Sequence, residues 1–267
     1  MRDRIPAMVD HPTPHAEVNV VLGELLPRLH AILRAQFVGM YLTGSLATGD
    51  FDRNSDVDFV VVTEEEVGGE LFSALDILHR RVAMIDSWCA TQLDGGYIPR
   101  RALRRFDPSN AVHAHIDRGS GERLKLVQYD EGVVQSHLLR ERGITLEGPD
   151  PRTLIDKVTP GDLRNAMPRV LNGWAAGILD DPARIATQGY QSYTVLSLCR
   201  ILYTLEFGAV VSKQVAAQWG RQTLGQALLI DRAWIGRQHP ERAAAAADID
   251  GTLELIREIF RRTGTSL

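Results

Sequence analysis

The sequence has 267 residues, of which 24% are charged, and its formal net charge at pH 7 is −4. This length allows one large domain or two ordinary ones, and no apolar run approaches the roughly 20 residues that cross a bilayer. A mildly acidic chain disfavours nucleic acid as the partner, because phosphate contacts require a basic surface, and it favours a small-molecule acceptor.

The N-terminal half alternates predicted helices and strands. Its first segment, MRDRIPAMVDHPTP, is charged and lacks an apolar signal core, so we expect a cytoplasmic protein with no membrane partner. Helical periodicity and runs of β-branched and aromatic residues predict the following elements: a helix over 16–36, strands over 38–44 and 56–63, a helix over 64–84, a third strand over 87–98 broken at Gly95-Gly96, a hairpin of 111–117 and 122–130 around a turn at 118–121, and a helix over 131–142.

The second half reads as helix throughout. A segment rich in proline and glycine, LEGPDPRTLIDKVTPGD, separates it from the first half and predicts the domain boundary. Helices are expected over 161–178, 188–206, 212–222, 223–236 and 241–263. Mixed elements followed by pure helix predict two domains. These are an α/β (mixed sheet) domain over 1–152 and an all-α helical bundle over 153–267.

Two aspartates at the head of a predicted strand carry the chemistry. Asp56 and Asp58 are two residues apart, so on a strand their carboxylates share a face, where hard oxygens suit Mg²⁺ bound with substrate phosphates. Ten residues earlier, Gly44-Ser45 ends one strand and opens a short helix that offers the Ser45 hydroxyl and backbone N–H groups to phosphate. Considered separately, the two aspartates are also typical of a solvated strand end, and Gly44-Ser45 is also typical of an ordinary turn. Together they predict a phosphate and metal site.

This pattern resembles the signature of the polymerase-beta-type nucleotidyltransferase superfamily. The stretch YTVLSLCRILYTLEFGAVVSKQVAAQWG resembles the helical C-terminal domain of the aminoglycoside (streptomycin/spectinomycin) adenylyltransferases, and LEGPDP resembles their inter-domain connector. Together these matches cover most of residues 38 to 222. The resemblance implies an antibiotic-resistance enzyme that uses ATP and two Mg²⁺ ions, transfers AMP to a hydroxyl group and releases pyrophosphate. It also implies that the helical domain closes the active-site cleft.

The resembled family has a third carboxylate, usually a glutamate, as general base on the strand beside the two aspartates. The best match in LDGGYIP is Asp94, which we expect to be both a metal ligand and the base. The shorter aspartate must still come within about 2.6–3.2 Å of the proton it takes, or act through water. Two alternatives remain open: Asp94 is a turn residue before two glycines, or Asp86 takes the role.

Two cations of the second domain match the family's phosphate ligands. Arg200 lies inside the apolar helix VLSLCRILYTL, where a guanidinium needs an anionic partner. From the residues alone, the favoured partner is an acid of the protein itself, either Glu206 or an acid of another helix. Ser212 is expected to cap the next helix and place Lys213 in its first turn, the end suited to anions. In the resembled family, an arginine and a lysine at these positions hold the ATP phosphates.

The acceptor is the least determined part of the reaction. The family binds its cationic antibiotic partly through acids just before the arginine-bearing helix, but the corresponding segment here, ARIATQGYQSYTV, contains none. This argues against streptomycin itself. We expect Tyr190 and Tyr193 to line a more neutral pocket, with Asp130 and Glu131 contributing from the first domain. A lincosamide or protein hydroxyl acceptor, or a non-catalytic nucleotide-binding module of regulatory or antitoxin-like type, are the alternatives.

Two further groups of residues are interpreted as structural. The basic run PRRALRR is expected to be a solvated helical face rather than a phosphate-steering patch. His113 and His115 alternate on a predicted strand and could face a metal together, but no third ligand is assigned to them.

Overall fold

The structure is a computed structural model that describes residues 12–118 and 123–263. The first eleven residues and most of the expected turn at 118–121 lie outside the described residues. The chain divides into two compact units. The first consists of the residues up to Tyr129 together with Leu138–Asp156, and the second of Asp130–His137 together with the residues from Lys157 onward. Residues 130–137, which we expected in the first domain, therefore group with the helical unit.

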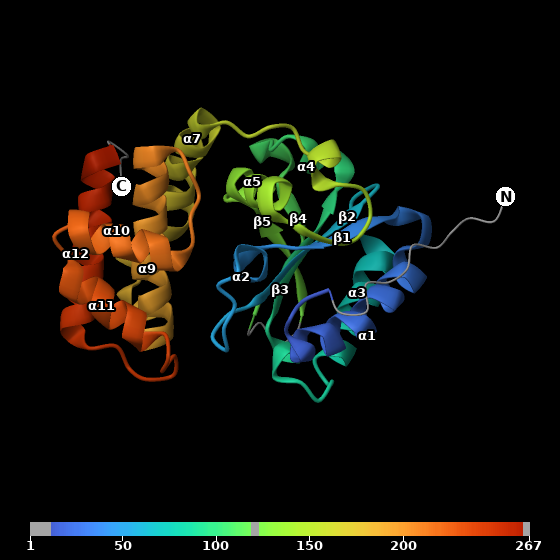
Figure 1. Cartoon of the computed structure of the whole chain (residues 1–267), viewed down its shortest axis with the longest axis horizontal. Helices are drawn as coiled ribbons and strands as arrows, with labels where there is room; N and C mark the ends of the chain where they lie inside the picture. Colours follow the sequence, from blue (N-terminus) through green and yellow to red (C-terminus); the bar gives the residue numbers. More distant parts are fainter. Residues whose placement is uncertain (1–11, 119–122, 264–267) are drawn as a thin grey trace. The chain divides into compact units, whose positions relative to one another are not determined.

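The first unit is built on a six-stranded mixed sheet (Figure 1). Its order is β5-β4-β3-β2-β1-β6. β2 and β3 are parallel, and the other neighbours are antiparallel. The strands are β1 (Phe37–Leu42), β2 (Val57–Thr63), β3 (Leu93–Pro99), β4 (Val112–Ile116), β5 (Leu124–Gln128) and β6 (Ile144–Glu147). The register of the parallel pair sets two acidic positions, Asp58 and Asp94, side by side.

Each face of this sheet has its own hydrophobic core. α1 (Ala16–Leu33) and α3 (Gly69–Val82) contact each other and cover one face, where Val57, Phe59 and Tyr97 are buried. On the other face, Val60 and Val62 pack with residues of α4 (Arg100–Arg104), α6 (Pro151–Leu154) and the end of α5 (Gly132–Arg142). Because successive residues of a strand point to opposite faces, Asp58 lies on the second face, between the buried Val57 and Phe59 of the first.

Two local differences from the expected elements have clear causes. The first half of the expected third strand is a 3₁₀ helix, Trp88–Thr91, whose first turn is capped by the Ser87 side chain accepting from the Cys89 N–H. β6 was not predicted, because its residues read as part of a linker. It pairs with β1, and the Tyr41 hydroxyl fixes the following residues by donating to the Pro149 carbonyl at 2.8 Å.

The second unit is helical, as predicted. Its helices are α7 (Pro160–Val170), α8 (Ala176–Asp180), α9 (Gln188–Phe207), α10 (Lys213–Thr223), α11 (Ala227–Gly236) and α12 (Ala246–Thr263). α9 contacts α7, α10, α11 and α12 and is the central helix of the unit. The predicted helix over 161–178 is α7 and α8 joined by one π-helical turn, Leu171–Ala175. Such turns are rare and often occur at functional sites.

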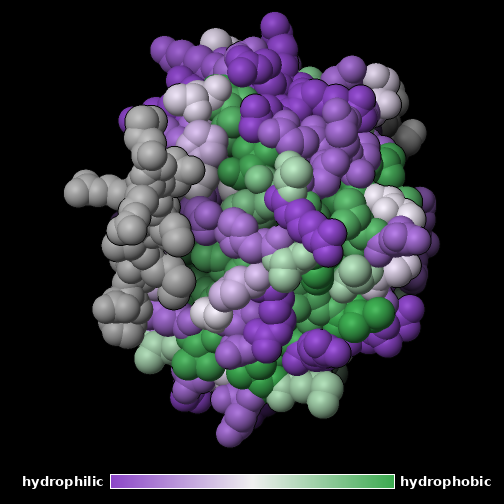
Figure 2. All heavy atoms as spheres, turned by 90° about the vertical axis from the view of Figure 1, so that its right-hand side faces the viewer, coloured by the Kyte–Doolittle hydropathy of each residue, from purple (hydrophilic) through white to green (hydrophobic). Residues whose placement is uncertain are grey.

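The surface of the first unit carries hydrophobic residues interspersed among hydrophilic ones. Figure 2 shows hydrophobic residues exposed in patches between hydrophilic ones. Val20 of α1 and Ile77 of α3, for example, are each half exposed. Among residues 12–118 and 123–263, no helix has the length and hydropathy required to span a bilayer.

Candidate functional site

Asp58 and Gly44 form the tightest part of the site in the first unit. Asp58 is on β2, and α2 (Gly44–Thr48) begins directly after β1. A β-carbon on Gly44 would lie 1.9 Å from Asp58 Oδ2, and Gly44 has a φ of +57°. Only glycine can therefore accept both the backbone conformation and the carboxylate. The neighbouring Ser45 Oγ is buried and has no hydrogen-bond partner among the described residues, which is uncommon for a buried polar atom.

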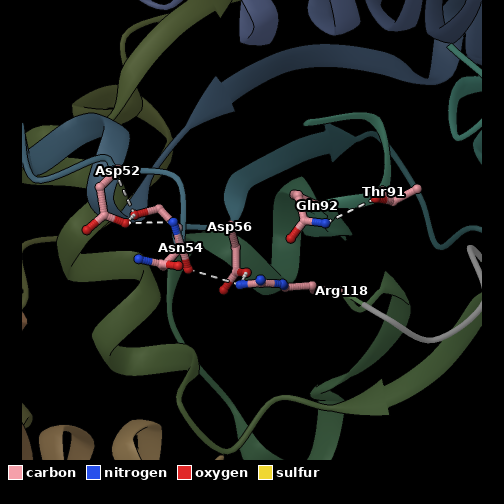
Figure 3. Close-up of polar contacts among 7 residues, drawn as sticks. Asp52, Asn54, Asp56, Thr91, Gln92 and Arg118 are labelled. Carbon is pink, nitrogen blue, oxygen red and sulfur yellow. Dashed lines mark hydrogen bonds and ion pairs between the residues drawn. The ribbon is translucent and has the colours of Figure 1, made fainter. Parts of the chain in front are cut away.

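Asp56 lies one residue before β2 rather than on it. The strand begins at Val57, so strand periodicity does not by itself fix where the Asp56 side chain points. An arginine that the sequence did not suggest contacts it: Arg118 Nη1 is 2.6 Å from Asp56 Oδ1 and donates to the Asn54 carbonyl at 3.0 Å (Figure 3). Arg118 follows β4, distant in sequence from Asp56 but beside it in the fold.

Asp94 is on β3, directly opposite Asp58 in the parallel register. The two glycines after it do not make a turn, because β3 continues through both. They allow close approach instead: a β-carbon on Gly95 would meet the Phe59 ring at 2.6 Å, and one on Gly96 would meet the Tyr129 hydroxyl at 1.7 Å. The turn interpretation of Asp94 is therefore wrong. Asp86, the alternative, is exposed and lies before the 3₁₀ helix, off the strand.

A buried histidine of β4 lies against Asp94. His115 Nε2 is 3.3 Å from Asp94 Oδ1 and 2.9 Å from Asp117 Oδ1, while Nδ1 is 2.6 Å from the Tyr129 hydroxyl. Burial alone would lower the pKa of His115, but hydrogen bonds to Asp117 and Asp94 outweigh it and raise the pKa to about 9. The three side chains could ligate a metal ion. Binding there would have to displace the proton that Nε2 shares with the carboxylates.

In the second unit, Arg200 and Lys213 lie on α9 and α10. Among the described residues Arg200 has no ion pair with an acid, and its Nε is buried without a hydrogen-bond partner. The predicted pairing with Glu206 is thus not found. Gly208 ends α9 in the left-handed conformation, and Ser212 caps α10 by accepting from the Val215 N–H. Lys213 is the first residue of α10, as predicted, with its ammonium group 5.4 Å from the Tyr193 ring centre.

The weaker acceptor candidates also belong to the second unit. Tyr190 and Tyr193 lie on α9 with ring centres 5.8 Å apart, and Trp174 of the π-helical turn donates to the Tyr190 hydroxyl at 3.3 Å. The Asp130 carboxylate packs against Gly173: a β-carbon on Gly173 would lie 2.3 Å from Asp130 Oδ2. Desolvation raises the pKa of Tyr193, and the charge of Glu131 adds to the rise.

The residues interpreted as structural have protein partners. Each basic residue of the PRRALRR run that forms an ion pair has its own acid: Arg100 with Glu64, Arg101 with Glu66 and Arg104 with Asp156. His113 lies 3.2 Å from Glu66, and so does not share a partner with His115. Sequence reasoning missed Arg118 and the contact of His115 with Asp94, because both depend on how β4 is paired with β3.

Comparisons with known proteins agree with this division into two units. Residues 26–89 match the family described as a nucleotidyltransferase domain, and residues 153–259 match the C-terminal domain of aminoglycoside adenylyltransferase. The chain is 26% identical to an aminoglycoside (3'') (9) adenylyltransferase of Escherichia coli over 87% of this chain and 90% of the relative. It is 27% identical to a spectinomycin 9-adenylyltransferase of Staphylococcus aureus over 69% of this chain and 71% of the relative.

A solved structure shares the fold. The crystal structure of the spectinomycin adenyltransferase from Enterococcus faecialis with ATP and spectinomycin has a TM-score of 0.69 to this chain. It is 15% identical, and the match covers 91% of this chain and 98% of that one.

Proposed function

We infer that this chain, which belongs to the aminoglycoside adenylyltransferase-like members of the polymerase-beta-type nucleotidyltransferase superfamily, transfers AMP from ATP to a hydroxyl group of an aminoglycoside or aminocyclitol with release of pyrophosphate. One observation carries the proposal. Asp58 lies against Gly44 at the start of α2 and opposite Asp94 in the register of two parallel strands. Two carboxylates beside a helix start that admits no side chain at Gly44 form a set of oxygens that suits a metal ion bound together with phosphate.

We propose that Asp56, Asp58 and Asp94 hold Mg²⁺. The donor set suits this ion, which prefers carboxylate oxygens and shares its coordination with phosphate. The lack of space for a β-carbon at Gly44 and the unpartnered, buried Ser45 hydroxyl fit a site that admits a phosphate chain closely. When bound, the metal supplies positive charge that stabilises the phosphoryl oxygens as negative charge develops on them.

Several side chains are proposed to bind the phosphates of ATP. In the first unit, the Ser45 hydroxyl donates to a phosphate oxygen, next to the backbone at Gly44. In the second, we propose that Arg200 and Lys213 bind the triphosphate and neutralise the leaving pyrophosphate. The support for Arg200 is its buried Nε with no partner, because such a group is costly unless a ligand completes its hydrogen bonds.

Asp94 is the proposed general base. Its carboxylate takes the proton of the acceptor hydroxyl as that oxygen bonds to the α-phosphorus, and the bond from the α-phosphorus to the bridging oxygen of pyrophosphate breaks. His115 holds Asp94 Oδ1 from the side of β4, which limits the rotation of this short side chain. The aspartate therefore has a fixed orientation, although it is one methylene shorter than the glutamate of the resembled family.

We propose that Tyr190 and Tyr193 form the aromatic side of the acceptor site. Asp130 and Glu131 would pair with the ammonium groups of the acceptor. The acids group with α9 instead of with the sheet. They thus replace, from another segment, the acidic residues absent from the start of the arginine-bearing helix. A pocket with few acids favours an aminocyclitol of low charge over streptomycin.

The experiment is a panel assay with ATP, Mg²⁺ and aminoglycosides, aminocyclitols and lincosamides as acceptors, scored by pyrophosphate release and by mass spectrometry of the acceptor. We expect a mass gain of one AMP on at least one aminoglycoside or aminocyclitol, and none with Asp58→Asn. A mass gain of one AMP on a protein, with none on the small molecules, would show that the acceptor is a protein hydroxyl instead of an aminoglycoside or aminocyclitol. No turnover with any acceptor, combined with tight ATP binding, would favour a non-catalytic nucleotide-binding module.

A further inference from the structure

The pairing of Arg118 with Asp56 places a cation of the protein on a carboxylate assigned to the metal. The guanidinium donates through one nitrogen to both Asp56 Oδ1 and the Asn54 carbonyl, at 2.6 and 3.0 Å (Figure 3). Both side chains are about one third exposed. The ion pair is therefore accessible to an ion from solvent. Because it is partly exposed, it contributes little free energy and can be broken by a competing ion.

The acceptors of Arg118 belong to a preformed turn. The Asn54 N–H donates to Asp52 Oδ1 at 2.8 Å, and the Ser55 N–H donates to the Asp52 carbonyl at 3.0 Å. Two hydrogen bonds thus hold the carbonyl of Asn54 and the start of β2 in place without help from Arg118. Removal of the guanidinium should leave this turn, and with it the position of Asp56, unchanged.

A divalent ion bound at Oδ1 would compete with Arg118 for Asp56, because two cations on the same carboxylate repel each other. An ion at this position would therefore weaken the contact of the guanidinium with the carboxylate and leave its contact with the Asn54 carbonyl. The ion arrives with a triphosphate, whose oxygens form short, strong hydrogen bonds with arginine. Arg118 lies two residues after the end of β4, and its side chain is about one third exposed, so the guanidinium is accessible to a ligand from solvent.

We propose that Arg118 is a further residue of the nucleotide site: it neutralises Asp56 in the metal-free chain and transfers to the triphosphate when the metal–ATP complex binds. This rests on the proposed function, because it assumes that Asp56 is a metal ligand. The exchange makes two opposite predictions for one substitution. Removal of Arg118 strengthens the binding of a metal ion alone, and it weakens the binding of a metal–nucleotide complex.

Arg100 provides the matched control. It pairs with Glu64 at 2.7 Å, and both partners are similarly exposed. Glu64 follows the last residue of β2, whereas Asp56 precedes the first, so the two ion pairs lie at opposite ends of the same strand. Arg118→Gln and Arg100→Gln make the same change in net charge, and only the first removes a cation from a proposed metal ligand.

The first measurement is Mn²⁺ binding to the full chain without nucleotide, followed by the loss of the free-ion signal in electron paramagnetic resonance. We expect Arg118→Gln to bind about twofold to fivefold more tightly than the wild type, the range of an exposed ion pair, and Arg100→Gln to match the wild type. Equal or weaker binding by Arg118→Gln overturns the competition. If Asp56→Asn also leaves Mn²⁺ binding unchanged, the metal site itself, and hence the proposed function, fails.

The second measurement is calorimetry at saturating Mg²⁺ with an ATP analogue in which carbon replaces the α–β bridging oxygen. We expect Arg118→Gln to bind the analogue about tenfold more weakly, because one charge-assisted hydrogen bond is lost. Arg118→Lys should retain part of the wild-type affinity, and the control Arg100→Gln should bind the analogue as tightly as the wild type. An unchanged affinity in Arg118→Gln would show that the displaced guanidinium turns to solvent, and would overturn the transfer to the triphosphate.

Discussion

The carboxylate of Asp58 lies against the α-carbon of Gly44, so closely that a β-carbon on Gly44 would be 1.9 Å from Asp58 Oδ2. Gly44→Ala should therefore displace Asp58 and reduce kcat/KM at least about 100-fold, as misplacement by about 1 Å does. Gly49 is the control: it follows α2 with a φ of +82°, and nothing lies within 4 Å of its β-carbon position. Gly49→Ala carries the same backbone strain without the clash. Equal losses of activity in the two variants would contradict the role given to the contact.

Asp94→Asn should lower kcat by about 10²–10⁴-fold without a comparable change in KM for ATP, because it removes the proposed base but keeps the shape. Asp94→Glu restores the length of the family's glutamate, and we expect it to retain far more activity than Asp94→Asn. Asp117→Asn is the control, since Asp117 also contacts His115 Nε2. The measurement is steady-state kinetics. If Asp117→Asn reduces kcat as much as Asp94→Asn does, Asp94 is not the general base.

Arg200→Leu should have opposite effects on stability and on binding. The Nε of Arg200 is buried on α9 without a hydrogen-bond partner, so removal of the guanidinium should raise Tm by about 2–4 °C. The same change should weaken the affinity for the ATP analogue about tenfold or more. Arg221→Leu removes an arginine that is paired with Asp231 and should do neither. A fall of Tm in Arg200→Leu, measured by scanning calorimetry, would indicate a structural role instead.

Asp130→Asn should raise KM for a cationic acceptor several-fold and leave KM for ATP unchanged. Asp130 rests on Gly173 beside Trp174, which contacts Tyr190, so its charge acts where the acceptor is proposed to bind. Asp180→Asn changes an exposed acid of α8 in the same unit and serves as the control. Initial-rate kinetics with the best acceptor of the panel decide between them, and equal KM values for the two variants would remove Asp130 from the acceptor site.

Stability should fall in acid because of His79. This side chain is 2% exposed, and its Nε2 is 2.8 Å from the Tyr97 hydroxyl. Burial lowers its pKa to about 4. The unfolded chain binds a proton near pH 6.5 and the folded chain does not, so the stabilisation present above pH 6.5 is lost as the pH falls toward 4.

The free energy of unfolding in urea should decrease on the order of 2 kcal/mol between pH 7 and pH 5 from this group alone. His79→Gln keeps a hydrogen-bonding group toward Tyr97 but cannot titrate. Its free energy of unfolding should depend less steeply on pH over the same range, and an identical slope would exclude His79 as the cause.

The sequence by itself predicted the mixed sheet, the helical second half and the residue types of the candidate site. Helical periodicity in the second half, the capping of α10 by Ser212 and the end of α9 at Gly208 are local signals, and the structure confirms each of them. The mixed sheet followed from apolar runs of strand length. Local patterns are readable in this way because the period of the side chains depends only on the backbone conformation of the same segment.

Only the tertiary structure decided which side chains meet. β6 was missed because its pairing with β1 is supplied by a partner more than 100 residues away. The contacts of Asp94 with His115 and of Asp56 with Arg118 likewise depend on the order and register of β2, β3 and β4. Register is set by how both faces of the sheet pack, which no single segment records. The carboxylates of the candidate site were therefore visible in the sequence, whereas the arginine that pairs with one of them was visible only in the fold.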